Sequence, residues 1–184
     1  TSVPSKPTHQ KSTFASETPV TDGRHVYVYL GDIGLFAVDF TWAPIWSVPM
    51  DWLPRREWGA ASSPVLHDGR LYVVNDNDEQ SYLLALSKKT GGEVWRTDRN
   101  EGTNWSTPYI WENELRTEIV TTGTDKVRSY DLDGNVLWEL TGMSSITIPT
   151  PFAEFGMLYL SSGYLGDQRR PVLAIRPGAS GDIS

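Results

Sequence analysis

The stretch LALSKKTGGEVW at residues 84–95 decides the fold, because its features recur along the chain. Each copy begins with a Ser or Thr followed by Pro and an apolar residue, and the prolines of these marks are Pro19, Pro64, Pro108 and Pro151. Successive prolines lie 45, 44 and 43 residues apart, and three of the four copies later reach a Trp. Marks that recur in register indicate a repeat protein with a unit of about 44 residues.

The repeat also predicts how the chain is divided. A polar N-terminal segment covers 1–13, and the repeat domain covers 14–184. The last unit is expected to be incomplete, since the sequence reaches Ser184 about where the Trp of that unit would fall. The predicted units are 14–58, 59–103, 104–146 and 147–184.

Short apolar runs separated by turns fill each unit. Val26 and Val28 alternate with Tyr27 and Tyr29, and this period of two is typical of β-strands. Asp-Gly pairs, such as the one at 68–69, favour tight hairpin turns in which Gly takes a positive φ. No amphipathic helical pattern competes with this reading. The sequence therefore predicts an all-β β-propeller made of four-stranded antiparallel blades.

The unit resembles the tryptophan-docking repeat of the PQQ-type β-propeller proteins, which include quinoprotein-like and BamB-like members. Their repeat reads Ala-x-Asp-x-x-Thr-Gly-Lys-x-x-Trp. Here Ala85, Thr90, Gly91 and Trp95 match it, whereas Ser87 replaces the Asp. The resemblance implies a ring of seven or eight blades, so about four repeats predict part of a larger ring. It also implies that the chain meets further propeller blades, a second copy of itself or another protein.

Each copy places a small residue nine or ten positions before its Trp. A large flat ring is expected to wedge adjacent sheets together, because a blade buries its faces against its neighbours. The small residue would leave room for a neighbour's ring, and a Gly would form the turn between them without Cβ strain. A structural role in the repeat is therefore predicted for Trp46, Trp95, Trp138, Ala37, Ala85 and Gly91.

Composition excludes several classes of function. The net charge of −7 argues against nucleic acid as a partner, since phosphates require a basic surface. The chain has no Cys, so it has neither disulfides nor cysteine-based metal sites. No apolar run approaches the roughly 18–20 residues that cross a bilayer. The resemblance implies a periplasmic or otherwise exported protein.

Two further Trp residues are the best candidates for a partner-binding surface. Trp58 and Trp105 lie just before a Ser/Thr-Pro mark, where the chain enters the inner strand of a blade. Their rings are therefore placed either at the mouth of the central channel or between blades. Arg55 and Arg56 lie beside Trp58 and belong to the same candidate surface.

Two polar segments complete the set of candidates. Arg169 and Arg170 could contact an anionic partner, although we interpret them as a solvated turn with Asp167 nearby. The run 75–80, NDNDEQ, alternates oxygen-bearing side chains as a calcium loop does. It lacks the Gly and the Glu that such a loop requires at its sixth and twelfth positions, so we interpret it as a solvated acidic hairpin loop.

We favour a non-catalytic scaffold or protein-interaction module and assign no catalytic, cofactor-binding or metal-binding residue. The first alternative is the propeller of a quinoprotein oxidoreductase, for which the resemblance implies PQQ with a calcium ion. No stretch aligns with the calcium ligands of that class, and we expect no cofactor. The second alternative is a carbohydrate-binding propeller that uses Trp58 and Trp105.

Overall fold

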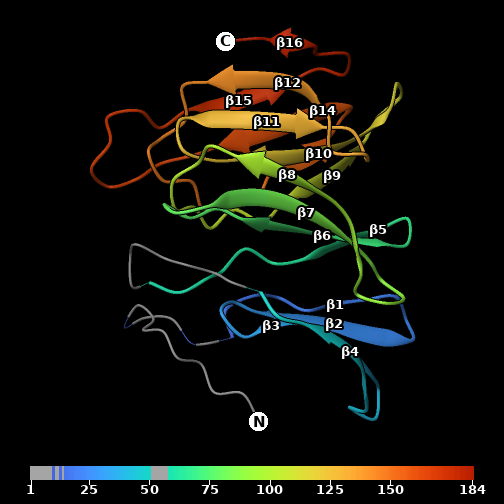
Figure 1. Ribbon diagram of the computed structural model, residues 1–184. Coiled ribbons are helices and arrows are strands. Elements are labelled where there is room, and N and C mark those ends of the chain that lie inside the picture. The colour runs from blue at the N-terminus through green and yellow to red at the C-terminus, as the bar shows by residue number, and fades with distance from the viewer. Residues whose placement is uncertain (1–9, 11–12, 14, 51–57) are drawn as a thin grey trace.

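The computed structural model describes residues 10, 13, 15–50 and 58–184. Every regular element in this part of the chain is a β-strand, and the strands form four sheets that follow one another in chain order (Figure 1). We call these sheets blades A to D. The described residues include no helix that is long and apolar enough to cross a membrane. The prediction of an all-β protein with four-stranded antiparallel blades is confirmed.

Blades A and B are regular antiparallel meanders in which each strand pairs with the next. Blade A contains β1 (Val20–Thr21), β2 (His25–Leu30), β3 (Gly34–Asp39) and β4 (Pro44–Val48). Blade B contains β5 (Val65–His67), β6 (Arg70–Asn75), β7 (Ser81–Ser87) and β8 (Glu93–Arg99).

Blades C and D follow the same order but differ in strand number. Blade C contains β9 (Tyr109–Glu112), β10 (Thr117–Thr122), β11 (Lys126–Tyr130) and β12 (Val136–Thr141). Blade D contains only β13 (Phe152–Glu154), β14 (Met157–Ser161) and β15 (Val172–Ile175). The last strand, β16 (Gly181–Asp182), pairs in parallel with β12 as a fifth strand of blade C.

Packing explains why β16 joins blade C and leaves blade D with three strands. Ala179 and Ile183, on either side of β16, pack against the apolar cluster between blades C and D. Arg116 of blade C donates from Nη2 to the carbonyl of Ala179 at 2.5 Å, and the Ile183 amide donates to the carbonyl of Glu139 at 2.9 Å. Blade C therefore has five strands and blade D has three, because β16 pairs with β12.

The first strands of consecutive blades converge. Strand β1 contacts β5, β5 contacts β9, and β9 contacts β13, so the inner edges of the blades meet while the fourth strands lie outside. The Ser/Thr-Pro marks join these inner edges. The Thr18 amide donates to Ser63 Oγ at 2.9 Å, and the Ser63 amide donates to Thr107 Oγ1 at 3.0 Å. Residues that match across repeats thus hydrogen-bond to one another.

Apolar side chains fill the space between each pair of blades. Strand β6 is buried on both faces, since Leu71 belongs to the cluster between A and B and Tyr72 to the cluster between B and C. Alternation along a strand sends neighbouring side chains to opposite faces, so one strand serves two interfaces. A third cluster, built around Trp111 and Trp138, fills the space between C and D.

Trp46 and Trp95 each dock on the outer turn of the next blade. Trp46 Nε1 donates to the carbonyl of Lys88 at 3.0 Å, and Trp95 Nε1 donates to the carbonyl of Leu132 at 2.8 Å. Both rings cover a Gly of that turn, so closely that a Cβ on Gly91 would stand 2.6 Å from the Trp46 ring. A docked ring thus requires a turn residue without a side chain.

The other repeat residues are placed differently. Trp138 is fully buried, but its Nε1 donates to Glu118 Oε2 of its own blade at 2.7 Å. Ala37 and Ala85 lie opposite the Trp of their own blade in the strand register, each fully buried. The expectation that these Ala residues leave room for a neighbour's ring stays a prediction.

Gly91 gives a first test of the docking. It has φ +71 and faces the Trp46 ring, whereas Gly69 has φ +78 and no atom near the place of a Cβ. We expect Gly91→Ala to lower the free energy of unfolding by about 2–5 kcal/mol, from backbone strain plus overpacking. The matched variant Gly69→Ala should cost about 1–2 kcal/mol, from strain alone. Urea denaturation measures both, and equal costs would contradict the docking.

Glu17 gives a second test, through pH. Its side chain is buried beside the β2–β3 turn, where Oε1 accepts from the Gly31 amide at 3.2 Å. Burial raises the pKa of Glu17 from 4.5 to about 7. The folded state then holds the proton more tightly than the unfolded state, so the free energy of unfolding falls between pH 4.5 and 7 and levels off above that range.

Glu17→Gln should remove this fall, because the amide needs no proton to remain neutral. At pH 8 we expect the variant to be more stable than wild type by on the order of 2–3 kcal/mol. At pH 4 the two proteins should differ little. Denaturation curves at both pH values measure the difference, and a variant that is destabilised equally at both would show that Glu17 is not held protonated.

Candidate functional site

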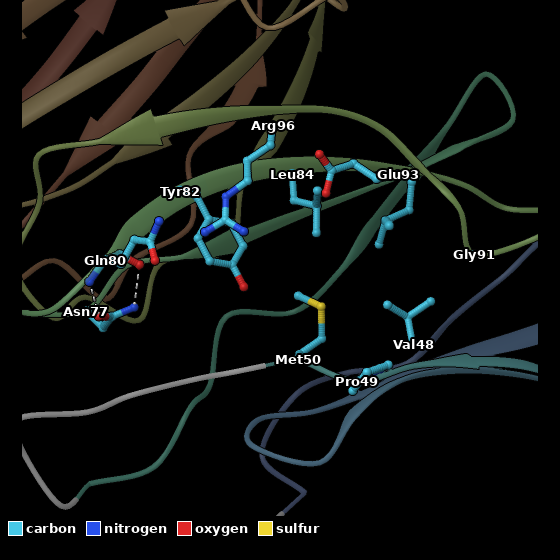
Figure 2. Close-up of a pocket in the computed structure, with 11 residues that line it drawn as sticks. Val48, Pro49, Met50, Asn77, Gln80, Tyr82, Leu84, Gly91, Glu93 and Arg96 are labelled. Carbon is cyan, nitrogen blue, oxygen red and sulfur yellow. Dashed lines mark hydrogen bonds between the residues drawn. The ribbon is translucent and has the colours of Figure 1, made fainter.

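A groove between blades A and B is the candidate binding site (Figure 2). It has a volume of about 270 Å³ and lies beside the end of β4. Its floor is apolar and its rim is polar. The residues used below are Met50, Leu84 and Leu86 of the floor, and Tyr82, Glu93 and Arg96 of the rim.

Strand alternation and a Pro shape the groove. Tyr82, Leu84 and Leu86 alternate along β7 and therefore share the face that meets blade A. On the other side, Pro49 follows the last residue of β4, Val48, where a residue without an N–H does not extend the ladder. Figure 2 shows Met50 and Tyr82 on opposite sides of the space that results.

The rim is organised by one aromatic ring. The guanidinium carbon of Arg96 lies 3.7 Å from the centroid of the Tyr82 ring, which is a cation–π contact. Asn75 Nδ2, on the neighbouring strand, donates to the Tyr82 hydroxyl at 2.7 Å and holds that ring in place. Arg96 Nε also lies 3.6 Å from Asp98. The groove thus holds a positioned cation at its rim, and Glu93 of the same strand lies beside Leu84 of the apolar floor (Figure 2).

The loop at 75–80 supports the rim and does not match its prediction. Asn75, Asp76 and Asn77 are buried, so the interpretation of the whole run as a solvated loop is wrong. Asn77 Oδ1 accepts from the amides of Glu79 and Gln80, which closes the turn. Burial of Asp76 is possible because Arg99 neutralises it.

Arg99 and Asp76 form a fully buried ion pair between blades B and C. Arg99 Nε and Nη2 donate to the two Asp76 oxygens at 2.8 and 3.0 Å, and Nη1 donates to Thr121 Oγ1 at 2.6 Å and to the Tyr130 hydroxyl at 2.7 Å. Burial alone would lower the pKa of Arg99, but the Asp76 charge outweighs it and holds that pKa above its usual range. The guanidinium therefore stays charged and joins two blades.

Further carboxylates of blades B and C are also matched by cations. Glu101 accepts from Arg128 and from the Thr124 amide, and Glu139 accepts from both Arg128 and Lys126. The two hydrogen bonds from Lys126 and Arg128 hold the pKa of Glu139 below its usual range. These charges belong to a network that connects sheets and are not aimed at the groove.

The structure brings Trp58 and Trp105 together. Their rings stack with centroids 5.5 Å apart, and Trp105 Nε1 donates to the carbonyl of Gly59 at 2.8 Å. Both rings are half-buried where the chain crosses from one blade to the next. Their pairing joins two crossover segments, and their role in partner binding stays a prediction. Arg55 and Arg56 lie outside the described residues.

Arg169 and Arg170 lie in the loop between β14 and β15, away from the groove. Arg169 is exposed and forms an ion pair with Asp125 at 3.2 Å. Asp167, the expected neighbour of the pair, instead accepts from the amide and the hydroxyl of Ser145. Both Arg residues are exposed in this loop, and their role in binding an anionic partner stays a prediction.

The buried carboxylates do not fit a calcium–PQQ pair. Asp76 and Glu101 are already matched by Arg99 and Arg128. Glu118 accepts from Arg116 Nε, Ser129 Oγ and Trp138 Nε1, which leaves no converging oxygen cage. Within the described ranges, no group of three or more His, Asp or Glu residues is arranged to hold a metal ion.

Comparison with known proteins agrees with this architecture. Residues 37–161 match the family model described as outer membrane protein assembly factor BamB. The chain belongs to this family. The match spans the last strands of blade A, all of blade B, β9 to β12 of blade C, and β13 and β14 of blade D, so it rests on the repeats themselves. No curated protein sequence matches the chain at a significant level.

Solved structures show the same fold. BamB from Moraxella catarrhalis superposes with a TM-score of 0.62 at 14% identity, over 90% of this chain and 55% of that one. The quinohemoprotein alcohol dehydrogenase ADHIIG from Pseudomonas putida HK5 gives 0.54 at 16% identity, over 84% and 30%. A europium-containing methanol dehydrogenase gives 0.57 at 11% identity, over 84% and 37%. The BamB-like chain thus spans about half the length of the BamB structure, and less of the dehydrogenases.

The buried ion pair gives a third test. Arg99→Met leaves Asp76 buried without its cation and should lower the free energy of unfolding by about 3–5 kcal/mol. Replacing both partners, with Arg99→Met and Asp76→Leu, should recover most of that loss, since no uncompensated charge remains. Arg169→Ala, which breaks an exposed pair, should cost less than about 1 kcal/mol. Urea denaturation measures all three, and a double variant as unstable as the single one would contradict the pairing.

Proposed function

We propose that this chain is a non-catalytic, protein-binding scaffold of an exported protein, and that the groove between blades A and B receives an extended segment of its partner. The observation that carries the proposal is the Arg96 guanidinium held over the Tyr82 ring beside an apolar floor. Tyr, Arg and Met are the residue types enriched where proteins bind one another, and all three line this groove. The family description, which names an outer membrane assembly factor, supports an exported location.

The chemistry of the groove defines the segment that it would accept. Leu84, Leu86 and Met50 offer a floor for one aliphatic or aromatic side chain. Arg96 would pair with a carboxylate beside that residue, and Glu93, farther along the same strand, with a cation. An apolar residue flanked by opposite charges would match the groove, and a uniformly basic segment would be repelled at Arg96.

Charge reversal at the rim tests this function. Short fluorescein-labelled peptides with a central Leu, an Asp before it and a Lys after it should bind wild type, and the same peptide with Asn for Asp should bind more weakly. Arg96→Glu should weaken binding of the Asp peptide at least tenfold, or about 1.4 kcal/mol. Arg169→Glu, the same charge change at a distant exposed site, should leave binding unchanged. Fluorescence anisotropy gives the dissociation constants.

Equal binding by wild type and Arg96→Glu would contradict the groove as the binding site. The first alternative, a quinoprotein, is favoured by the likeness to two dehydrogenase folds. Titration with PQQ and calcium separates it, since saturable quenching of the Trp emission would favour the oxidoreductase over the scaffold. The second alternative, carbohydrate binding, is tested on a glycan array with Trp105→Ala, which removes one half of the stacked Trp pair.

A further inference from the structure

Blades A and D each leave one sheet face without a neighbouring blade among the described residues. Figure 1 shows blade A, in blue, at one end of the series of sheets. Blades B and C lie between two neighbours and are covered on both faces. We therefore aligned the strands of these blades by their register and compared the residues on each open face with those at the covered interfaces.

The open face of blade A matches the face that blade B presents to A. Tyr27 lies opposite Ala37 in blade A, just as Tyr72 lies opposite Ala85 in blade B, so the two registers can be aligned. The aligned partners on the other face are Val26 with Leu71, Val28 with Val73, Phe36 with Leu84, and Val38 with Leu86. All four residues of blade B belong to the cluster between A and B, whereas all four of blade A are only half-buried.

The open face of blade D matches the face that blade A presents to B. Tyr159 lies opposite Phe152 and Ala174, as Tyr27 lies opposite Val20 and Ala37. By the same register Val172 takes the place of Leu35. Leu35 is 0% exposed, whereas Val172 is 79% exposed and Phe152 56%. Phe152 and Tyr159 stack with centroids 5.2 Å apart, which makes a continuous apolar face.

The two open faces are thus the two halves of a contact that this chain already makes once, between blades A and B. We propose that two copies of the chain pack head to tail, with blade D of each copy on blade A of the other. The arrangement is a closed ring of eight blades. It satisfies both open faces of both copies with one repeated interface, as twofold closure requires.

The size of the arc supports a second copy as the occupant. Four blades from each copy give eight, which lies within the range that propellers close with. The chain also covers 55% of the BamB structure, so its blades account for about half of a ring of that fold. Further repeats supplied from another source would compete for the same faces, and the experiment below separates the two occupants.

Mass measurement of the 184-residue chain tests the proposal. Light scattering after gel filtration, and native mass spectrometry, should give twice the 20.6 kDa of one chain over a range of concentrations. A monomer would overturn the proposal and leave the faces to other blades. An open series of trimers and larger species would overturn ring closure.

Variants on the two faces test the geometry. Val172→Asp on blade D and Phe36→Asp on blade A should each give a monomer, because every interface of the dimer uses both faces. Leu165→Asp, at a side chain that is 91% exposed in the β14–β15 loop, should remain a dimer. Circular dichroism and melting curves confirm that each variant is folded before its mass is interpreted.

Mixing the two monomeric variants gives the decisive result. A Val172→Asp chain still has an intact blade A, and a Phe36→Asp chain still has an intact blade D. One interface of the two can therefore form, and a weaker heterodimer should appear in the mixture but in neither variant alone. A Val172→Asp protein that stays dimeric, or folded variants that do not associate when mixed, would overturn the head-to-tail packing.

Discussion

Each sheet of this protein depends on its neighbours, because a sheet here is covered only by another sheet. Leu71 and Tyr72 are adjacent in one strand, yet they belong to different interblade clusters. When a strand is buried on both faces, a shift of one residue in its pairing would exchange the side chains of two packed interfaces. The two neighbouring blades therefore fix the register of the strand together. Stability therefore resides in the interfaces between repeats more than in any single repeat.

The interfaces between blades are built from the same repeated strands but differ in their polar contacts. Between A and B, an indole donates to the backbone at Lys88, whereas between B and C a fully buried guanidinium reaches Tyr130 in addition to the matching indole bond. Trp138 instead turns to Glu118 of its own blade, and the C-terminal segment covers the outer edge of that sheet. Because the interface between B and C has its own buried polar contacts, exchanging blades B and C would leave buried donors or acceptors unpaired.

The sequence predicted what is local and repeated. The spacing of the Trp residues and the Gly residues at turns with positive φ are properties of a single unit, set by side-chain size and backbone sterics. Such local features were enough to predict the all-β architecture. The groove was not predictable, because Arg96 reaches Tyr82 across two strands whose register shifts at a bulge after Ala85. Asp76 was placed in solvent because its local sequence is polar, whereas the Arg that permits its burial lies 23 residues away.

Binding and assembly use different parts of a blade, so one does not exclude the other. The groove is bordered by Glu93 and Arg96 of β8, the outer strand of blade B, and by the end of β4, the outer strand of blade A. The open faces of blades A and D instead present the broad sides of their sheets. Closure of a ring would cover the faces and leave the outer strands accessible, and a second copy would then contribute a second groove. A scaffold closed in this way would gain two equivalent binding sites from one interface, which would raise the apparent affinity for any partner long enough to span both.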